Sequence, residues 1–115
     1  MAAKKTALTA KTMKMLRDDG WFVEKVEYWN AFAKRRKDLF GIIDVVAIKE
    51  GEPGVLGIQV TSKANISARK KKAKEAPELA AWLSCGNRFV VHGWFLRATG
   101  RRKWCVKEVD ISLAG

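Results

Sequence analysis

The sequence predicts one α/β domain, residues 1–115, in which helices flank a central mixed β-sheet. Short β-branched and aromatic runs recur with strand-like spacing, and segments of helical periodicity stand before and between them. A hydrophobic content of 48% with five Trp is enough to build a packed core without disulfides. The expected order of elements is α-β-β-β-α-β-β, because helices packed on a sheet are the usual way to cover such strands.

The first two elements are a helix over residues 6–19 and a strand over residues 21–29. Leu8, Met15 and Leu16 follow the helical spacing, and Gly20 is a residue that ends helices. The strand alternates two faces, and neither is purely apolar, so we expect it to be partly exposed or to lie near a site.

Two apolar runs, expected as strands at about 40–48 and 55–61, form the centre of the chain. The polar link between them contains two Gly and a Pro and is typical of a hairpin loop. Asp44 interrupts the first strand, and Gln59 and Thr61 share one face of the second. If the strands pair antiparallel, Asp44 and Gln59 approach each other, and a carboxylate there needs a charged partner or a metal ion.

The second half of the chain is expected to contain a helix at 68–75, a second helical segment from Pro77, and two strands. Ser67 is a candidate N-cap for the first helix, and Gly86 follows the second segment. The strands are expected at 88–97 and 103–111, joined by a turn that contains Gly100.

The charge of the chain favours nucleic acid as its partner. Lys and Arg number 23 against 12 Asp and Glu, which gives a net charge of +11. The cations cluster in a loop over residues 30–38 and in the helix at 68–75. The residues expected to contact the phosphate backbone are Lys34, Arg35, Arg36, Lys37, Arg69, Lys70, Lys71 and Lys72.

Other classes of protein are disfavoured. The chain has no apolar run long enough to span a membrane, and its start lacks the apolar block of a signal peptide, so we expect a cytoplasmic location. Cys85 and Cys105 have no metal-type spacing and are expected to be small core residues. His92, the one histidine, is expected to be a sheet residue rather than a catalytic base.

The order of elements and two short motifs resemble the PD-(D/E)xK nuclease superfamily, and within it small Holliday-junction-resolvase-like proteins of phage or bacterial type. The motifs are a segment of the form RxDLFGxxD at residues 36–44 and the sequence QVTS at 59–62, followed by a basic helix. The resemblance covers residues 6 to about 97 and implies a restriction-endonuclease-like core.

That resemblance implies phosphodiester hydrolysis with Mg²⁺ or Mn²⁺ held by Asp44, Gln59 and the Val60 carbonyl. The chain departs from the family where Gln59 replaces a carboxylate and Thr61 replaces the catalytic lysine. Lys63 is a candidate for the missing lysine, and Glu27 or Asp38 for the missing carboxylate. The catalytic candidates are therefore Asp44, Gln59, Thr61, Lys63 and Glu27.

We therefore expect a metal-dependent endonuclease that acts on DNA, either double-stranded or branched and structured, and the resemblance further implies a homodimer. One alternative is a non-catalytic nucleic-acid-binding module on the same fold, since Gln59 and Thr61 weaken the expected site. Another is a basic protein that recognises acidic protein surfaces. Each candidate also has a purely structural interpretation. Asp44 can be a carboxylate that accepts backbone hydrogen bonds, and Gln59 can be a buried amide whose hydrogen bonds are satisfied. Thr61 can be an ordinary sheet residue, and Glu27 can be one half of an ion pair.

Overall fold

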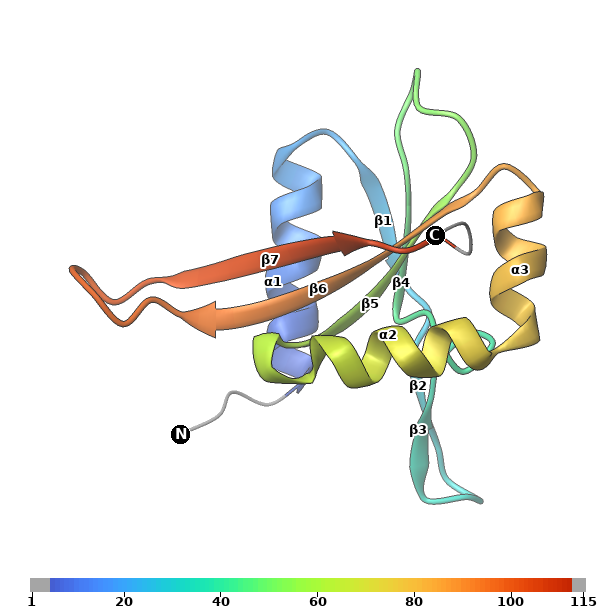
Figure 1. The fold of residues 1–115 in the computed structure, drawn as a ribbon, viewed down its shortest axis with the longest axis horizontal. Coiled ribbons are helices and arrows are strands. Elements are labelled where there is room, and N and C mark those ends of the chain that lie inside the picture. Colours follow the sequence, from blue (N-terminus) through green and yellow to red (C-terminus); the bar gives the residue numbers. More distant parts are fainter. Residues whose placement is uncertain (1–4, 113–115) are drawn as a thin grey trace.

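The computed structural model describes residues 5–112 and is a mixed α/β structure (Figure 1). Its elements in chain order are α1 (Lys5–Asp18), β1 (Phe22–Lys25), β2 (Tyr28–Asn30), β3 (Arg35–Lys37), β4 (Val45–Ile48), β5 (Leu56–Ser62), a 3₁₀ turn (Lys63–Asn65), α2 (Ile66–Glu75), α3 (Pro77–Ser84), β6 (Arg88–Leu96) and β7 (Trp104–Asp110). Among residues 5–112, no helix is both long enough and apolar enough to cross a bilayer.

Five of the strands form one mixed sheet in the order β1-β4-β5-β6-β7. Neighbours are antiparallel except β5 and β6, which run parallel. A parallel pair needs a long crossover connection, and α2 and α3 provide it. The expected α/β class, with a mixed sheet flanked by helices, is confirmed.

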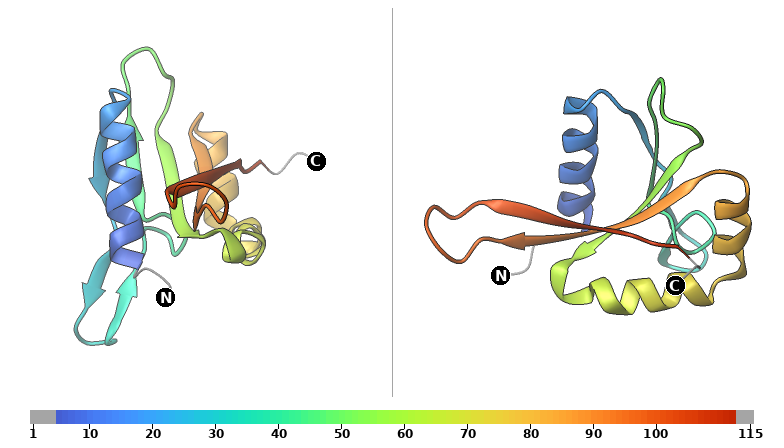
Figure 2. Two further views of the ribbon diagram at one scale, coloured as in Figure 1. Left: turned by 90° about the vertical axis from the view of Figure 1, so that its left-hand side faces the viewer. Right: turned by 45° about the horizontal axis from the view of Figure 1, so that its top comes forward.

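The helices cover both faces of the sheet, as the left view of Figure 2 shows. On one face α1 packs through Leu8 and Leu16 against a cluster that includes Ile58 and Val60 of β5. On the other face α2 and α3 pack against a cluster that includes Phe89 and Val91 of β6. Strand β5 is therefore buried from Leu56 to Thr61, and the packing on both of its faces fixes the positions of its side chains.

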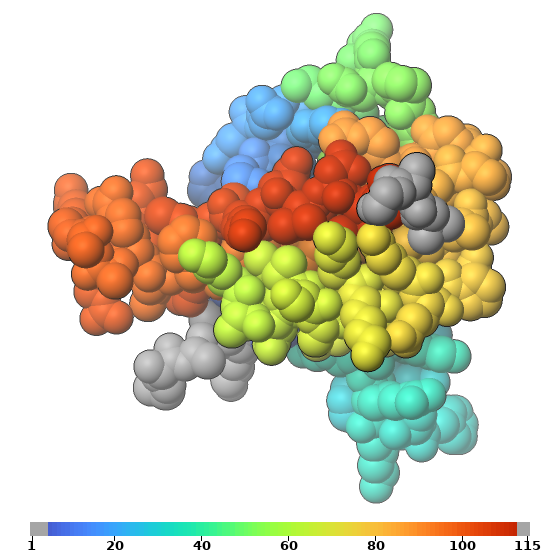
Figure 3. Space-filling view, viewed as in Figure 1, coloured from blue at the N-terminus to red at the C-terminus, as the bar shows by residue number. Residues whose placement is uncertain are grey.

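Two hairpins project from this core, as the space-filling view shows (Figure 3). One is the β6–β7 arm. The other is the β2–β3 hairpin, residues 28–37, whose two short strands form a separate two-stranded sheet. Residues 30–38 are thus mainly a β-hairpin, where the sequence predicts a loop.

The prediction of one strand over residues 21–29 is wrong, because the chain leaves the main sheet after Lys25. Val26 still donates its N–H to the Asp44 carbonyl at 2.8 Å, but Glu27 turns inward and β2 pairs only with β3. The strand expected at 40–48 is also shorter, since residues 39–43 form a turn and β4 begins at Val45.

Two smaller expectations also need correction. Helix α2 begins at Ile66, with Asn65 rather than Ser67 in the capping position. Cys85 is exposed at the end of α3 and Cys105 is half-buried, so these thiols are not core residues. Both thiols are free.

Gly54 is a point where the fold admits no side chain. Its φ is 73°, and a Cβ there would overlap the backbone carbonyl of Gly86 in the loop after α3. We expect Gly54→Ala to lower the free energy of unfolding by about 2 to 4 kcal/mol, because left-handed strain and a backbone clash add together. Urea unfolding of the purified variant measures this change.

Gly51 provides the matched control for that substitution. Its φ is 89°, but a Cβ there would meet nothing within 4 Å. Gly51→Ala should therefore cost only the left-handed strain, about 1 kcal/mol. Equal losses in the two variants would show that contact with the Gly86 carbonyl contributes nothing.

Candidate metal centre

Three carboxylates meet at the end of the sheet near the start of α1. They belong to Glu27, Asp38 and Asp44, and one oxygen from each lies within 4.8 Å of the others. Glu27 follows β1, Asp38 follows β3 and Asp44 precedes β4, so each acid stands just outside a strand. We call this group the carboxylate cluster.

A tight turn brings two of these acids together. Leu39 and Ile43 form an antiparallel bridge and exchange backbone hydrogen bonds of 2.9 and 3.0 Å. Phe40 and Gly41 turn the chain with positive φ values of 56° and 73°. Because Asp38 and Asp44 flank the two ends of this bridge, their carboxylates lie side by side.

Asp44 is fully buried and is held by three protein groups. Its Oδ2 accepts hydrogen bonds of 2.8 Å from the Gln59 side-chain amide and of 2.8 Å from the Val60 N–H. Its Oδ1 lies 3.1 Å from the Lys5 ammonium. The expected approach of Gln59 to Asp44 across the β4–β5 pair is therefore observed, with Gln59 as the donor.

Burial raises the pKa of Asp44 to about 7. The Lys5 charge and the Val60 N–H oppose that rise, whereas the neighbouring Asp38 carboxylate adds to it. The carboxyl group is thus poised between its neutral and ionised forms near neutral pH. A divalent cation, which stabilises the ionised form, would bind there with release of a proton.

Glu27 has one oxygen without a hydrogen bond. Its side chain is 1% exposed, and Arg36 donates to its Oε1 at 3.0 Å. Its Oε2 lies 3.7 Å from the Lys5 ammonium and accepts no hydrogen bond within the part of the chain that the structure describes. Since buried polar atoms normally have partners, this oxygen is available to a ligand.

The donor set fits a hard divalent cation. Carboxylate oxygens are the ligands that Mg²⁺ and Mn²⁺ prefer, and three of them converge here. Fully ionised, the cluster carries three negative charges against the two positive charges of Lys5 and Arg36. The excess is negative, in a chain whose net charge is +11.

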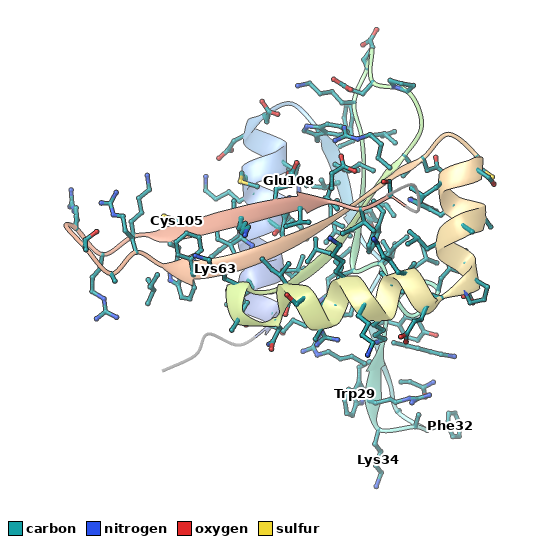
Figure 4. All side chains as sticks on the ribbon, in the orientation of Figure 1. Trp29, Phe32, Lys34, Lys63, Cys105 and Glu108 are labelled. Atoms are coloured by element: carbon teal, nitrogen blue, oxygen red, sulfur yellow. The ribbon has the colours of Figure 1, made fainter. Side chains whose placement is uncertain are left out.

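The remaining predicted site residues divide between those near the cluster and those away from it. Val60 contacts Asp44 through its N–H, and Thr61 is buried in β5 on the same face as Gln59. Lys63 does not reach the carboxylates, because its ammonium lies 4.5 Å from the centre of the Phe95 ring. Figure 4 shows Lys63 beside the end of β6.

The basic residues predicted to bind nucleic acid lie on two elements. Lys34, Arg35, Arg36 and Lys37 belong to the β2–β3 hairpin, which leads directly into the cluster. Helix α2 carries the other four and has a shallow groove lined by Ser67, Lys70, Lys71, Lys74 and Glu75.

The interpretation of His92 as a sheet residue is confirmed. It is fully buried in β6, between the Thr12 hydroxyl at 3.2 Å and the Glu108 carboxylate at 2.9 Å. The hydrogen bond between His92 and Glu108 is the main reason that the pKa of Glu108 lies below its usual range. These contacts tie β6 to α1 and β7, so His92 supports the fold.

Lys5 is the functional candidate that the sequence did not reveal. It contacts both Asp44 and Glu27, although 39 residues separate it from Asp44 along the chain. Thr6, beside it, accepts a hydrogen bond of 2.8 Å from Arg36. A lysine at the start of a basic helix carries no local signal that distinguishes it from its neighbours.

No family model matches this chain, and comparison with curated proteins and with solved structures likewise finds no match. The resemblance to PD-(D/E)xK nucleases therefore rests on the motifs at 36–44 and 59–62 and on the order of elements.

Proposed function

We propose that this protein is a metal-dependent endonuclease that hydrolyses phosphodiester bonds in DNA. The observation that carries the proposal is the carboxylate cluster, in which a buried Glu27 oxygen accepts no hydrogen bond from the described residues and has only the Lys5 ammonium nearby, at 3.7 Å. A strongly cationic protein gains nothing in DNA affinity from three gathered acids, since they repel phosphate. Their position at the base of a basic hairpin is explained if a divalent cation joins them to the phosphate.

In this proposal Asp44, Asp38 and Glu27 are the candidate ligands. Bound Mg²⁺ or Mn²⁺ would polarise the scissile phosphate and activate a water for attack. Gln59 and the Val60 N–H hold the Asp44 carboxylate in place through their hydrogen bonds, and Gln59 is thus a positioning residue. The metal-ligand role that the resemblance implies for Gln59 is proposed here for Glu27 and Asp38 instead.

Lys5 takes the role that the resemblance assigns to a lysine on the second strand. Its ammonium lies beside two of the proposed ligands, where it can stabilise negative charge that develops on the phosphate. Arg36 lies against Glu27 and links the site to the hairpin.

The β2–β3 hairpin and α2 supply the phosphate contacts in this proposal. They carry the eight cations expected to bind DNA, so affinity should fall steeply as salt rises. A homodimer remains part of the proposal, since two copies of one site are a simple way to cut both strands.

A non-catalytic DNA-binding module is the second candidate, and one observation favours it. Both oxygens of Asp44 already face protein donors, namely Gln59, Val60 and Lys5, so the acid is stabilised without an ion. In that case the cluster would fasten α1 and the hairpin to the sheet.

A cleavage assay distinguishes the two candidates. Plasmid, linear duplex, single-stranded and four-way-junction DNA are incubated at low salt with Mg²⁺ or Mn²⁺, and with EDTA instead. We expect cutting of at least one substrate that requires the ion. Asp44→Ala should reduce cutting to the level of a buffer blank, because it removes the central ligand.

If no substrate is cut, a gel-shift measurement of DNA binding in the same samples shows which alternative applies. Salt-sensitive binding without cutting of any substrate would favour the binding module. Absence of any DNA retention would contradict both candidates and favour an acidic protein as the partner.

A further inference from the structure

The β2–β3 hairpin combines aromatic and basic side chains without a single acid. Residues 28–37 include Tyr28, Trp29 and Phe32, together with four consecutive cations at 34–37. The hairpin projects from the core, and Figure 4 shows Trp29, Phe32 and Lys34 standing out from it. A surface of this charge complements a polyanion and repels basic partners.

The hairpin aromatics do not serve the core. Tyr28 is 57% exposed, Trp29 61% and Phe32 102%, and these three are half of the large hydrophobic side chains that residues 5–112 expose. Exposed aromatics gathered on one short segment are typical of a binding surface, whereas scattered ones are ordinary. Packing within the protein therefore does not explain them.

Hydrogen bonds hold the tip so that Phe32 points outward. The Asn30 side-chain oxygen accepts bonds of 3.0 Å from the N–H of Phe32 and 3.0 Å from that of Ala33. Such a turn fixes a loop locally, without contacts from the rest of the molecule. The aromatic ring is thus presented at a defined position, at little entropic cost on binding.

One face of the hairpin leads to the carboxylate cluster. Trp29 and Arg36 are cross-strand partners, so their side chains leave the ribbon on the same side. Arg36 extends from that side to Glu27 and to Thr6 of α1. A base stacked on Trp29 would therefore lie on the side from which the strand can reach the cluster.

We propose that the β2–β3 hairpin binds unpaired bases, and that the preferred substrate is duplex DNA interrupted by unpaired nucleotides. This inference rests on the proposed endonuclease function and names the substrate class for that site. Inside a continuous duplex each base face is covered by its neighbours, so Trp29 and Phe32 can stack without the cost of unstacking base pairs only where the duplex is interrupted. The cations bind phosphate in either case and supply no preference.

The test compares affinities in EDTA, where the DNA stays uncut. Two fluorescein-labelled probes of equal length are titrated by anisotropy: a continuous duplex, and the same duplex with a short unpaired gap. We expect the wild-type protein to bind the gapped probe more tightly. Trp29→Ala and Phe32→Ala should each weaken gapped binding about 5-fold to 100-fold and change duplex binding less than about 2-fold.

Phe22→Ala is the matched control, because Phe22 is an aromatic residue that is 75% exposed on β1, outside the hairpin. It should change neither affinity. Equal wild-type affinities for the two probes, or an unchanged preference in both hairpin variants, would overturn the inference while leaving ion-dependent cutting intact. A preference that Trp29→Ala and Phe32→Ala abolish, in a protein that cuts nothing, would support the binding of unpaired bases by the hairpin but overturn the assignment of gapped DNA as a substrate, together with the endonuclease.

Discussion

Raising the pH from 4 to 8 without divalent ions is expected to destabilise the folded protein through Asp44. The unfolded chain releases this proton near the ordinary value of 3.8, whereas the folded protein keeps it until about pH 7. Between those values the folded state binds more protons, so each unit of rising pH favours unfolding by up to about 1.4 kcal/mol. Above about pH 7 the carboxyl is ionised in both states, and the full loss is present.

Urea unfolding of wild type and Asp44→Asn in EDTA, at pH values from 4 to 8, measures this effect. The variant cannot titrate at residue 44, so the difference between the two curves removes the contribution of the distant Glu108 and reports Asp44 together with the groups that interact with it. We expect that difference to change by a few kcal/mol. A constant difference across the range would mean that Asp44 binds its proton equally well in the folded and the unfolded protein, and that burial does not raise its pKa.

At pH 8, divalent ions should restore part of the folding stability that is lost when Asp44 ionises. Ten-millimolar Mg²⁺ or Mn²⁺ would bind the ionised cluster and raise the free energy of unfolding of the wild type by about 1 to 3 kcal/mol. The gain should shrink below pH 7, where binding must displace a proton. A gain of equal size in Asp44→Asn would place the ion elsewhere.

Lys5→Met is expected to lower the rate of ion-dependent cleavage by about 10² to 10³-fold. The substitution keeps the length of the side chain but removes the charge beside Asp44 and Glu27. Because that charge competes with a cation for the same oxygens, the variant should bind Mn²⁺ at least as tightly as wild type. Single-turnover cleavage and calorimetric Mn²⁺ titration measure the two quantities separately.

Lys63→Met is the matched control, since its ammonium lies over the Phe95 ring. It should change the cleavage rate less than about 3-fold. A large loss in Lys63→Met with little loss in Lys5→Met would return the catalytic role to the second strand. A parallel loss of rate and of Mn²⁺ affinity in Lys5→Met would indicate that Lys5 only holds the site together.

The elements that the sequence predicted well are those in which apolar residues recur with a clear helical or strand period. Helix α1 and strands β5, β6 and β7 lie within one or two residues of the expected ranges, because their apolar spacing continues from end to end. The contact between Asp44 and Gln59 followed from antiparallel pairing, in which one register places both side chains on one face.

The parts that it missed depend on tertiary contacts. The alternation from Trp21 to Trp29 has no visible break, yet Glu27 leaves the sheet because Lys5 and Arg36 stabilise its buried carboxylate. Strand β3 is predicted as part of a loop, because the repulsion between its consecutive cations hides a strand of only three residues, and Tyr28 and Trp29 of β2 are assigned to the strand before it. Asn30, which orders the tip, was the local signal available for that turn.

The sequence predicted the candidate acids of the carboxylate cluster but not that all three meet, because their meeting also depends on tertiary contacts. The sequence offers Asp38 and Glu27 as possible replacements for a missing acid, but two tertiary features bring them to Asp44. The tight turn at Phe40 and Gly41 places Asp38 there, and the departure of the chain from the main sheet after Lys25 places Glu27 there. A positive φ at a phenylalanine is uncommon, and no pattern of apolar residues predicts it.

All three acids and the hairpin come from one stretch, residues 27–44, in which the hairpin is an excursion between the first acid and the second. Its two strands pair only with each other, so their length and tip can change without disturbing the five-stranded sheet. If the proposed function is correct, natural variation or laboratory grafting that keeps Arg36, the partner of Glu27, could exchange the rest of this hairpin and direct the same acids to different polymers. The acids, which would perform the reaction, and the hairpin, which would select the target, could then evolve at different rates although both lie within residues 27–44.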